Sequence, residues 1–200
     1  MTGQFQWIEE PSTPCTHTRV RFWNPHGHEL RFVDVRSFGE MWWVPPDVEL
    51  TVGIPGLARL GPEPFSEAFS APYLKRQLKN SSRPIKTALL DQALVAGVGN
   101  IYADESLFSA GIPPLTPAGR LTLAQLERLR SSLVEVLTTS IGAGGTTFSD
   151  FRDLEGVNGN YGGQAWVYRR GGEPCRCCGT IIRRDKLSGR STHWCPTCQG

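Results

Sequence analysis

Apolar and polar residues alternate in short runs over positions 4–43. The runs cover 4–8, 19–23 and 29–33, and the turn-forming sequence Asn24-Pro25-His26-Gly27-His28 separates the last two. Because alternation places successive side chains on opposite faces of a strand, the pattern predicts an antiparallel sheet of about four strands with one buried face. Such a small sheet usually needs a partner layer, so we expect residues 1–60 to be the remnant of a larger β domain.

Helical periodicity replaces the alternation after Pro64. The apolar residues of the first helical segment stop at Gly97-Val98-Gly99, and they are Ile85, Ala88, Leu89, Ala93 and Ala96. Their spacing predicts a helix that ends at the glycines, after which Asn100 can cap a second helix that ends near Gly111. The capping-box sequence 122–125 predicts a third helix that runs to Gly142.

Glycine dominates the segments that follow the third helix. Residues 144–147 read Gly-Gly-Thr-Thr, and residues 155–163 contain four further glycines. No Gly-Lys-Ser/Thr sequence follows them, which excludes a P-loop. We expect an irregular loop that faces a ligand.

Composition and charge narrow the class of protein. The chain has 200 residues, of which 39% are hydrophobic and 20% charged, as in a globular protein. The amino-terminal residues do not resemble a signal peptide, and the apolar stretch 88–98 is interrupted by polar residues, so we expect a soluble, cytoplasmic protein. After residue 164, seven basic residues oppose two acidic ones, giving about +5 there although the net charge of the chain is +2. A basic carboxy-terminal segment suits a polyanion, although a solvated tail without a partner would look the same.

Four of the six cysteines form two Cys-x-x-Cys pairs, which are Cys175 with Cys178 and Cys195 with Cys198. Two such pairs let four thiolates close a tetrahedral shell, so the spacing predicts one structural zinc ion. A disulfide or redox pair is the alternative, and it leaves the matched form of the two pairs unexplained. Residues 180–182 and 191–194 are expected to be the strands of a hairpin around the basic turn 183–190.

The chain resembles the formamidopyrimidine-DNA glycosylase family over essentially its whole length. The resemblance is carried by 85–91, by Gly97-Val98-Gly99-Asn100-Ile101-Tyr102-Ala103-Asp104-Glu105, by 144–147 and by the four-cysteine tail. It implies an α+β fold with a partial antiparallel sheet domain over 1–60, a helix-two-turn-helix DNA-binding domain over 61–155, and a lesion-capping loop with a zinc finger over 156–200. The finger itself is expected to cover 166–200.

The same resemblance implies a set of DNA-binding residues. Lys86 and Asn100 would contact phosphates around the lesion, although Asn100 could serve only as a helix cap. Three side chains would fill the space left by a flipped nucleotide, and they are Met1, Arg36 and Phe38. His17 would contact DNA, and Arg190 would grip the flanking phosphates and assist late strand cleavage. Strand packing is the ordinary alternative for Arg36 and Phe38.

The activity implied is base excision in duplex DNA. The family removes oxidised purines such as 8-oxoguanine and formamidopyrimidines through a Schiff base, followed by β- and δ-elimination, and the chain is expected to act as a monomer near the nucleoid. This chemistry needs an amino-terminal proline, a following glutamate and a later lysine, which are not found at the corresponding places, so we expect an inactive or impaired form. The alternatives are a non-catalytic, zinc-dependent DNA-binding protein and a zinc-ribbon module for protein interaction.

Overall fold

The computed structural model describes residues 3–146, 154 and 157–200. It divides into two compact units, of which the first comprises Met1–Trp43 with Thr139–Gln164 and the second comprises Val44–Thr138 with Ala165–Gly200. The fold is mixed, as expected, with small antiparallel sheets, a helical part and a carboxy-terminal four-cysteine cluster. The domain bounds given above stay predictions.

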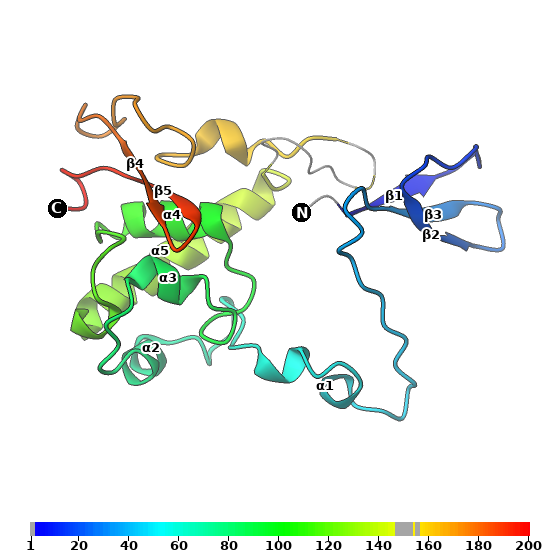
Figure 1. Cartoon of the computed structure of the whole chain (residues 1–200), viewed down its shortest axis with the longest axis horizontal. Helices are drawn as coiled ribbons and strands as arrows, with labels where there is room; N and C mark the ends of the chain where they lie inside the picture. The colour runs from blue at the N-terminus through cyan, green and yellow to red at the C-terminus, as the bar shows by residue number, and fades with distance from the viewer. Residues whose placement is uncertain (1–2, 147–153, 155–156) are drawn as a thin grey trace. The chain divides into compact units, whose positions relative to one another are not determined.

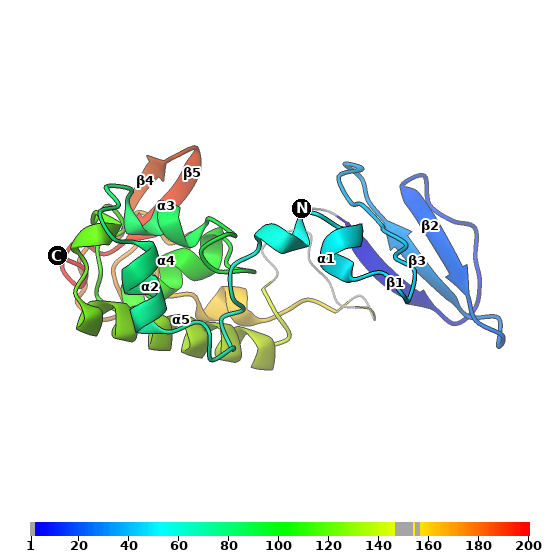
Figure 2. The same ribbon diagram turned by 90° about the horizontal axis from the view of Figure 1, so that it is seen from below.

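The first unit contains a sheet of three described strands in the order β1-β3-β2 (Figure 2). These strands are β1 (Gln4–Ile8), β2 (Thr18–Trp23) and β3 (Glu29–Val33), and both pairings are antiparallel. Alternation therefore located each strand to within one residue. The expectation of four strands was wrong for the described part of the chain, because Asp34 turns the backbone after β3 by accepting hydrogen bonds from the amides of Arg36 and Gly39.

The two faces of this sheet differ in character. Phe5 lies opposite Phe32 across the strands, with ring centroids 5.0 Å apart, and Trp7 lies opposite Leu30 on the same apolar face. On the other face the fully buried Glu29 carboxylate receives Arg21 at 2.7 Å and Arg31 at 2.8 Å. The charged groups on this face therefore form ion pairs with one another, which compensate the cost of burying the Glu29 carboxylate.

Most helices of the second unit pack around an apolar core, to which α1 contributes no residue, and a smaller apolar cluster lies at the finger (Figure 1). The α-helices are α1 (Leu50–Gly53), α2 (Ala71–Gln77), α3 (Ile85–Leu89), α4 (Asn100–Ser109) and α5 (Leu123–Gly142), with short 3₁₀ turns at Leu57–Arg59 and Ala118–Arg120. The predicted capping box begins α5, since the Thr122 amide donates to Gln125 and the Gln125 amide donates to Thr122. No helix in the described part of the chain is long and apolar enough to cross a membrane.

The first helix of the pair is shorter than its apolar spacing suggested. α3 ends at Leu89, because the Asp91 side chain accepts from the Ala93 amide and starts a run of turns instead. These turns end at Gly97, whose φ of 77° lies in the left-handed region that favours glycine. Asn100 is the first residue of α4 and not its cap, which is Gly99.

The carboxy-terminal hairpin consists of β4 (Arg183–Leu187) and β5 (Arg190–Trp194). The prediction that 180–182 form the first strand and 183–190 the turn was therefore wrong, because the basic residues 183–187 are themselves the first strand. Ser188 and Gly189 alone make the turn, with φ of 48° and 79°. Two successive positive φ values are what a tight two-residue hairpin requires. In sequence, β4 resembled a turn because four of its five residues are charged, and all four are exposed.

Candidate nucleic-acid interface and zinc site

The four paired cysteines converge as the spacing predicted. Their sulfur atoms all lie within 4.8 Å of one another, with Cys175 3.9 Å from Cys198 and Cys178 3.4 Å from Cys195. Tetrahedral zinc with Zn–S bonds of about 2.3 Å separates its sulfurs by about 3.8 Å, so the cluster fits this ion. No place remains in this shell for water or substrate, and the zinc is therefore structural.

The surroundings shift the cluster thiols in different directions, since burial raises the pKa of Cys195 and of Cys198. Hydrogen bonds from the side chain and backbone of Thr180 lower the pKa of Cys178 to about 6. A metal ligand must be deprotonated, so this position is prepared for zinc. Cys177 and Cys15 are exposed and take no part in the four-sulfur group.

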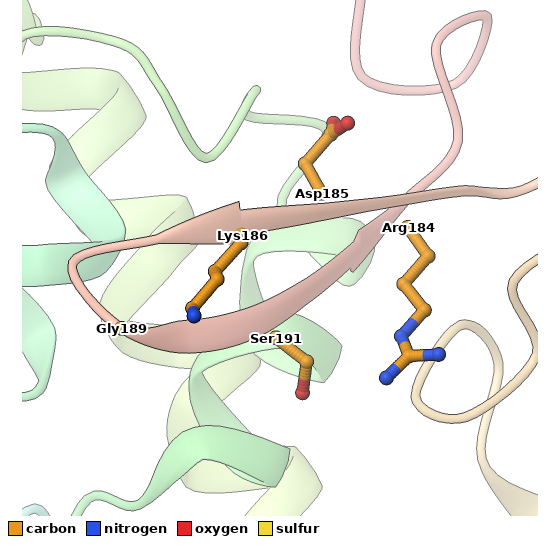
Figure 3. Close-up of a pocket in the computed structure, with 5 residues that line it drawn as sticks. All are labelled: Arg184, Asp185, Lys186, Gly189 and Ser191. Atoms are coloured by element: carbon orange, nitrogen blue, oxygen red, sulfur yellow. The ribbon is translucent and has the colours of Figure 1, made fainter.

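The hairpin presents its basic side chains on one side. Figure 3 shows Arg184 and Lys186 pointing to the same side as Ser191, whereas Asp185 points to the opposite side. The Asp185 carboxylate accepts a hydrogen bond from the Trp194 indole at 2.7 Å, which keeps its charge away from the basic side. A hollow of about 470 Å³ is lined by Arg184, Asp185, Lys186, Gly189 and Ser191.

A second hollow of about 310 Å³ adjoins the first, because both are lined by Arg184 and Ser191. Arg169 and His193 also line it, and Arg169 has a φ of 61°. Basic side chains therefore extend from the hairpin to Arg169. Arg190, the predicted phosphate-gripping residue, is exposed at the start of β5.

Lys86 and Asn100 meet at one backbone atom of the hairpin. The Lys86 ammonium donates to the Ser191 carbonyl at 2.7 Å, and the Asn100 amide nitrogen donates to the same oxygen at 3.0 Å. Lys86 is completely buried and forms an ion pair of 2.7 Å with Asp104. Burial lowers the pKa of Lys86, and the Asp104 carboxylate opposes this shift. In this structure the Lys86 ammonium faces protein groups, and its predicted contact with phosphate stays a prediction.

Two acidic residues of α4 were not singled out from the sequence. Asp104 Oδ2 receives the His193 amide at 2.9 Å and lies 3.1 Å from His193 Nδ1. Glu105 accepts hydrogen bonds from three successive backbone amides, those of Trp166, Val167 and Tyr168. Burial raises the pKa of Glu105, and these amides oppose the shift. The available signal was a pair of adjacent acidic residues in the middle of a helix.

The other predicted contacts lie in the first unit. His17, Arg36 and Phe38 are all exposed, and the Phe38 side chain exposes 71% of its surface. Asp34 connects the segments that carry these residues. Its amide donates to the His17 carbonyl, and its carboxylate accepts from the Arg36 amide in the turn that carries Arg36. Met1 lies outside the described residues. The structure thus groups the predicted site residues within each unit.

Three family models match the chain. They are the formamidopyrimidine-DNA glycosylase N-terminal domain at 1–41, the formamidopyrimidine-DNA glycosylase H2TH domain at 60–152, and the zinc finger found in FPG and IleRS at 172–200. Together they match more than half of the sequence.

Individual relatives and solved structures agree with these models. The chain is 98% identical to the formamidopyrimidine-DNA glycosylase of Parasynechococcus marenigrum (strain WH8102), over all of this chain and 72% of the relative. It is 67% identical to that of a Synechococcus strain, over all of this chain and 71% of the relative. The MutM (Fpg) crystal structure from Thermus thermophilus matches with a TM-score of 0.88 and 46% identity, over all of this chain and 73% of that one. A Lactococcus lactis Fpg in complex with abasic-site DNA matches with a TM-score of 0.89 and 33% identity, over all of this chain and 72% of that one.

Proposed function

Because the chain belongs to the formamidopyrimidine-DNA glycosylase family, we propose that it binds duplex DNA at oxidised purines and abasic sites. Family membership makes it a base-excision repair glycosylase for oxidised purines, with one structural zinc ion in the finger. It acts as a monomer in the cytoplasm, at the nucleoid. The observation that carries the proposal is the zinc-stabilised hairpin, whose basic side chains share one side (Figure 3).

The residues that would bind phosphates lie in the second unit. Arg190 is exposed beside the two basic hollows, and a guanidinium can hold two phosphate oxygens at once. The amino terminus of α4, where Asn100 follows two glycines, offers free amides and a favourable helix dipole to a second phosphate. Lys86, whose charge is paired with Asp104, supports the hairpin next to Arg190 through its hydrogen bond to the Ser191 carbonyl.

Lesion recognition falls to the first unit. Arg36 and Phe38, together with Met1, fill the space from which the damaged nucleotide is flipped, and His17 contacts the strand nearby. An apolar wedge recovers part of the stacking lost on flipping, and an arginine can hydrogen-bond the widowed base. The exposure of Arg36 and Phe38 supports this assignment, because neither side chain is used to fill a core.

The excision chemistry of the family divides between an amine nucleophile, proton-transfer groups and Arg190. In the family, a secondary amine at an amino-terminal proline attacks the sugar carbon to form a Schiff base, and a glutamate and a lysine move protons. Arg190 assists the last elimination. We propose that these 200 residues carry the lesion-binding part of that reaction. In domain terms, 1–60 and 61–155 form the lesion-reading and helical domains, and 156–200 form the capping loop and the finger, which itself covers 166–200.

One experiment separates this proposal from its alternatives. The 200-residue polypeptide is incubated with a duplex that carries 8-oxoguanine opposite cytosine, borohydride is added, and covalent adducts and gel-shift binding are measured together. Lesion-selective binding without an adduct supports the proposal. A trapped adduct would show that another amine performs the chemistry. Binding that ignores the lesion favours a general zinc-dependent DNA-binding protein, and no binding favours a protein-interaction module.

A further inference from the structure

We propose that Asp104 and His193 are positioning residues that hold Arg190 at the DNA surface, and that Lys86 affects DNA binding through this network. The inference rests on the proposed function, because it requires Arg190 to contact phosphate. It assigns roles to two residues that do not reach the surface of the hairpin, since Asp104 and His193 are both buried.

The three residues of β5 that follow Arg190 all contact side chains of the helical domain. The Ser191 carbonyl receives Lys86 and Asn100, and the Thr192 hydroxyl lies 2.9 Å from the Lys86 ammonium. His193 binds Asp104 through its backbone amide and lies within hydrogen-bond distance of it through its ring. Every bond in this set restrains the backbone or a buried side chain of β5. These contacts therefore fix the position of the strand that begins at Arg190 relative to α3 and α4.

The other side of Arg190 is also held. The Ser188 hydroxyl in the hairpin turn lies 3.4 Å from the Thr87 hydroxyl of α3. Arg190 consequently lies between two points at which the hairpin touches the helix pair. An exposed, flexible side chain on a fixed backbone loses less freedom on binding than one on a mobile hairpin, so this arrangement favours affinity.

Asp104 is the group on which the rest of the network depends. Its carboxylate is the counter-ion of Lys86 at 2.7 Å and the acceptor for His193 at 2.9 Å. Without this charge a buried ammonium is strongly disfavoured, and the Ser191 carbonyl would lose one of its two donors. Asp104 and Asn100 lie one turn apart on α4, so the same helix that offers its amino terminus to a phosphate also sets the hairpin.

A purely structural role would be served equally well by apolar side chains, because buried ion pairs can often be replaced by packed hydrophobic residues without loss of stability. A positioning role would not, since apolar side chains cannot direct the Ser191 carbonyl. The two roles therefore make different predictions for DNA affinity at equal fold stability.

The test is a double-mutant cycle on the 200-residue polypeptide, with a duplex that contains a tetrahydrofuran abasic-site analogue. Arg190→Ala and Asp104→Asn are each expected to weaken binding about tenfold, the effect of one charge-assisted hydrogen bond. The double variant is expected to lose clearly less affinity than the product of the two single losses, because Asp104 acts through the strand that carries Arg190. Glu127→Gln, which breaks an exposed 2.7 Å ion pair on α5, is the matched control and should leave affinity unchanged.

The outcomes are distinguishable. If Arg190→Ala leaves affinity unchanged, the proposed phosphate contact of Arg190 is wrong. If it weakens binding but the two effects multiply, the contact stands and the positioning role is wrong. A second variant, Lys86→Met with Asp104→Leu, separates fold from positioning: it should keep its zinc, and therefore a folded finger, while binding about tenfold more weakly. Wild-type affinity in that variant would overturn the inference.

Discussion

The Arg36 guanidinium lies over the Phe38 ring, with 5.3 Å between its central carbon and the ring centroid. Both side chains are exposed, and the turn that carries them is held by the buried Asp34 carboxylate. Gly39 is needed here, because a Cβ at this position would lie 2.6 Å from the Phe32 ring. The Arg36 and Phe38 side chains therefore project from a turn whose backbone is fixed by Asp34.

Replacing the aromatic member of this pair tests its use on DNA. Phe38→Ala is expected to weaken binding to abasic-site DNA about tenfold while leaving binding to undamaged duplex unchanged, because a wedge contributes only where a base can leave the stack. Val35→Ala is the control, since Val35 is an exposed apolar neighbour on the same turn. Competition gel shifts measure both affinities. An equal loss on damaged and undamaged duplex would contradict the wedge role.

Zinc binding is expected to depend on four of the six cysteines. Cys178→Ser should abolish stoichiometric zinc and lower the melting temperature, since a structural zinc site contributes folding free energy directly. Cys177→Ser, one residue away, should retain one zinc ion per chain. Metal analysis and thermal unfolding measure the two effects. Retained zinc in the Cys178 variant would show that another thiol completes the shell.

Glu105 is expected to contribute strongly to the stability of the finger. Glu105→Gln replaces one acceptor oxygen by an NH₂ group opposite an amide donor, and the loss of a buried, charge-assisted acceptor costs about 2–3 kcal/mol. Urea unfolding measures the change. The exposed Glu67→Gln is the control, and its free energy of unfolding should match that of the wild type. A Glu105 variant as stable as the wild type would contradict the assigned role.

Acid should weaken the three-stranded sheet through Glu29. Hydrogen bonds and charge from Arg21 and Arg31 hold the pKa of Glu29 well below its usual range. A carboxyl group with a depressed pKa in the folded state stabilises fully above its unfolded pKa of about 4.3, and this contribution is lost as the pH falls below that value toward the folded pKa. Melting temperatures between about pH 7 and about pH 3 should fall for the wild type.

Glu29→Gln provides the matched comparison for this pH dependence. The variant should be less stable than the wild type at about pH 7, and the difference between the two should shrink toward about pH 3. Glu10→Gln, at an exposed position, should follow the wild type throughout. A constant difference between Glu29→Gln and the wild type at all pH values would show that the carboxylate charge is not what stabilises the sheet.

Local signals explain how much of the fold the sequence predicts. Alternation located β1, β2 and β3, and the pairing of Thr122 with Gln125 marked the start of α5, because these signals act within a few residues. The cysteine spacing located the zinc site for the same reason. Composition was misleading for β4, because its run of charged residues is also typical of a turn. An exposed strand has no buried face, so no alternation of apolar residues marks it in the sequence.

The buried network lay beyond sequence reasoning because its partners are far apart in the chain. Lys86 meets Ser191 across 105 positions, and Asp104 meets His193 across 89. Periodicity placed Lys86 on a helix but could not distinguish a phosphate ligand from a buried ion pair. Only the packing of α4 against β5 decides between an exposed and a buried ammonium.

The most direct test of the account is the affinity of the 200-residue polypeptide for an abasic-site duplex, compared with an undamaged duplex of the same sequence, before and after zinc removal. The account predicts that the zinc-loaded chain prefers the abasic duplex at least about tenfold and that chelation removes most of the binding to both duplexes, since the finger supplies the phosphate contacts. Equal affinity for the two duplexes, or binding that survives chelation unchanged, would contradict it.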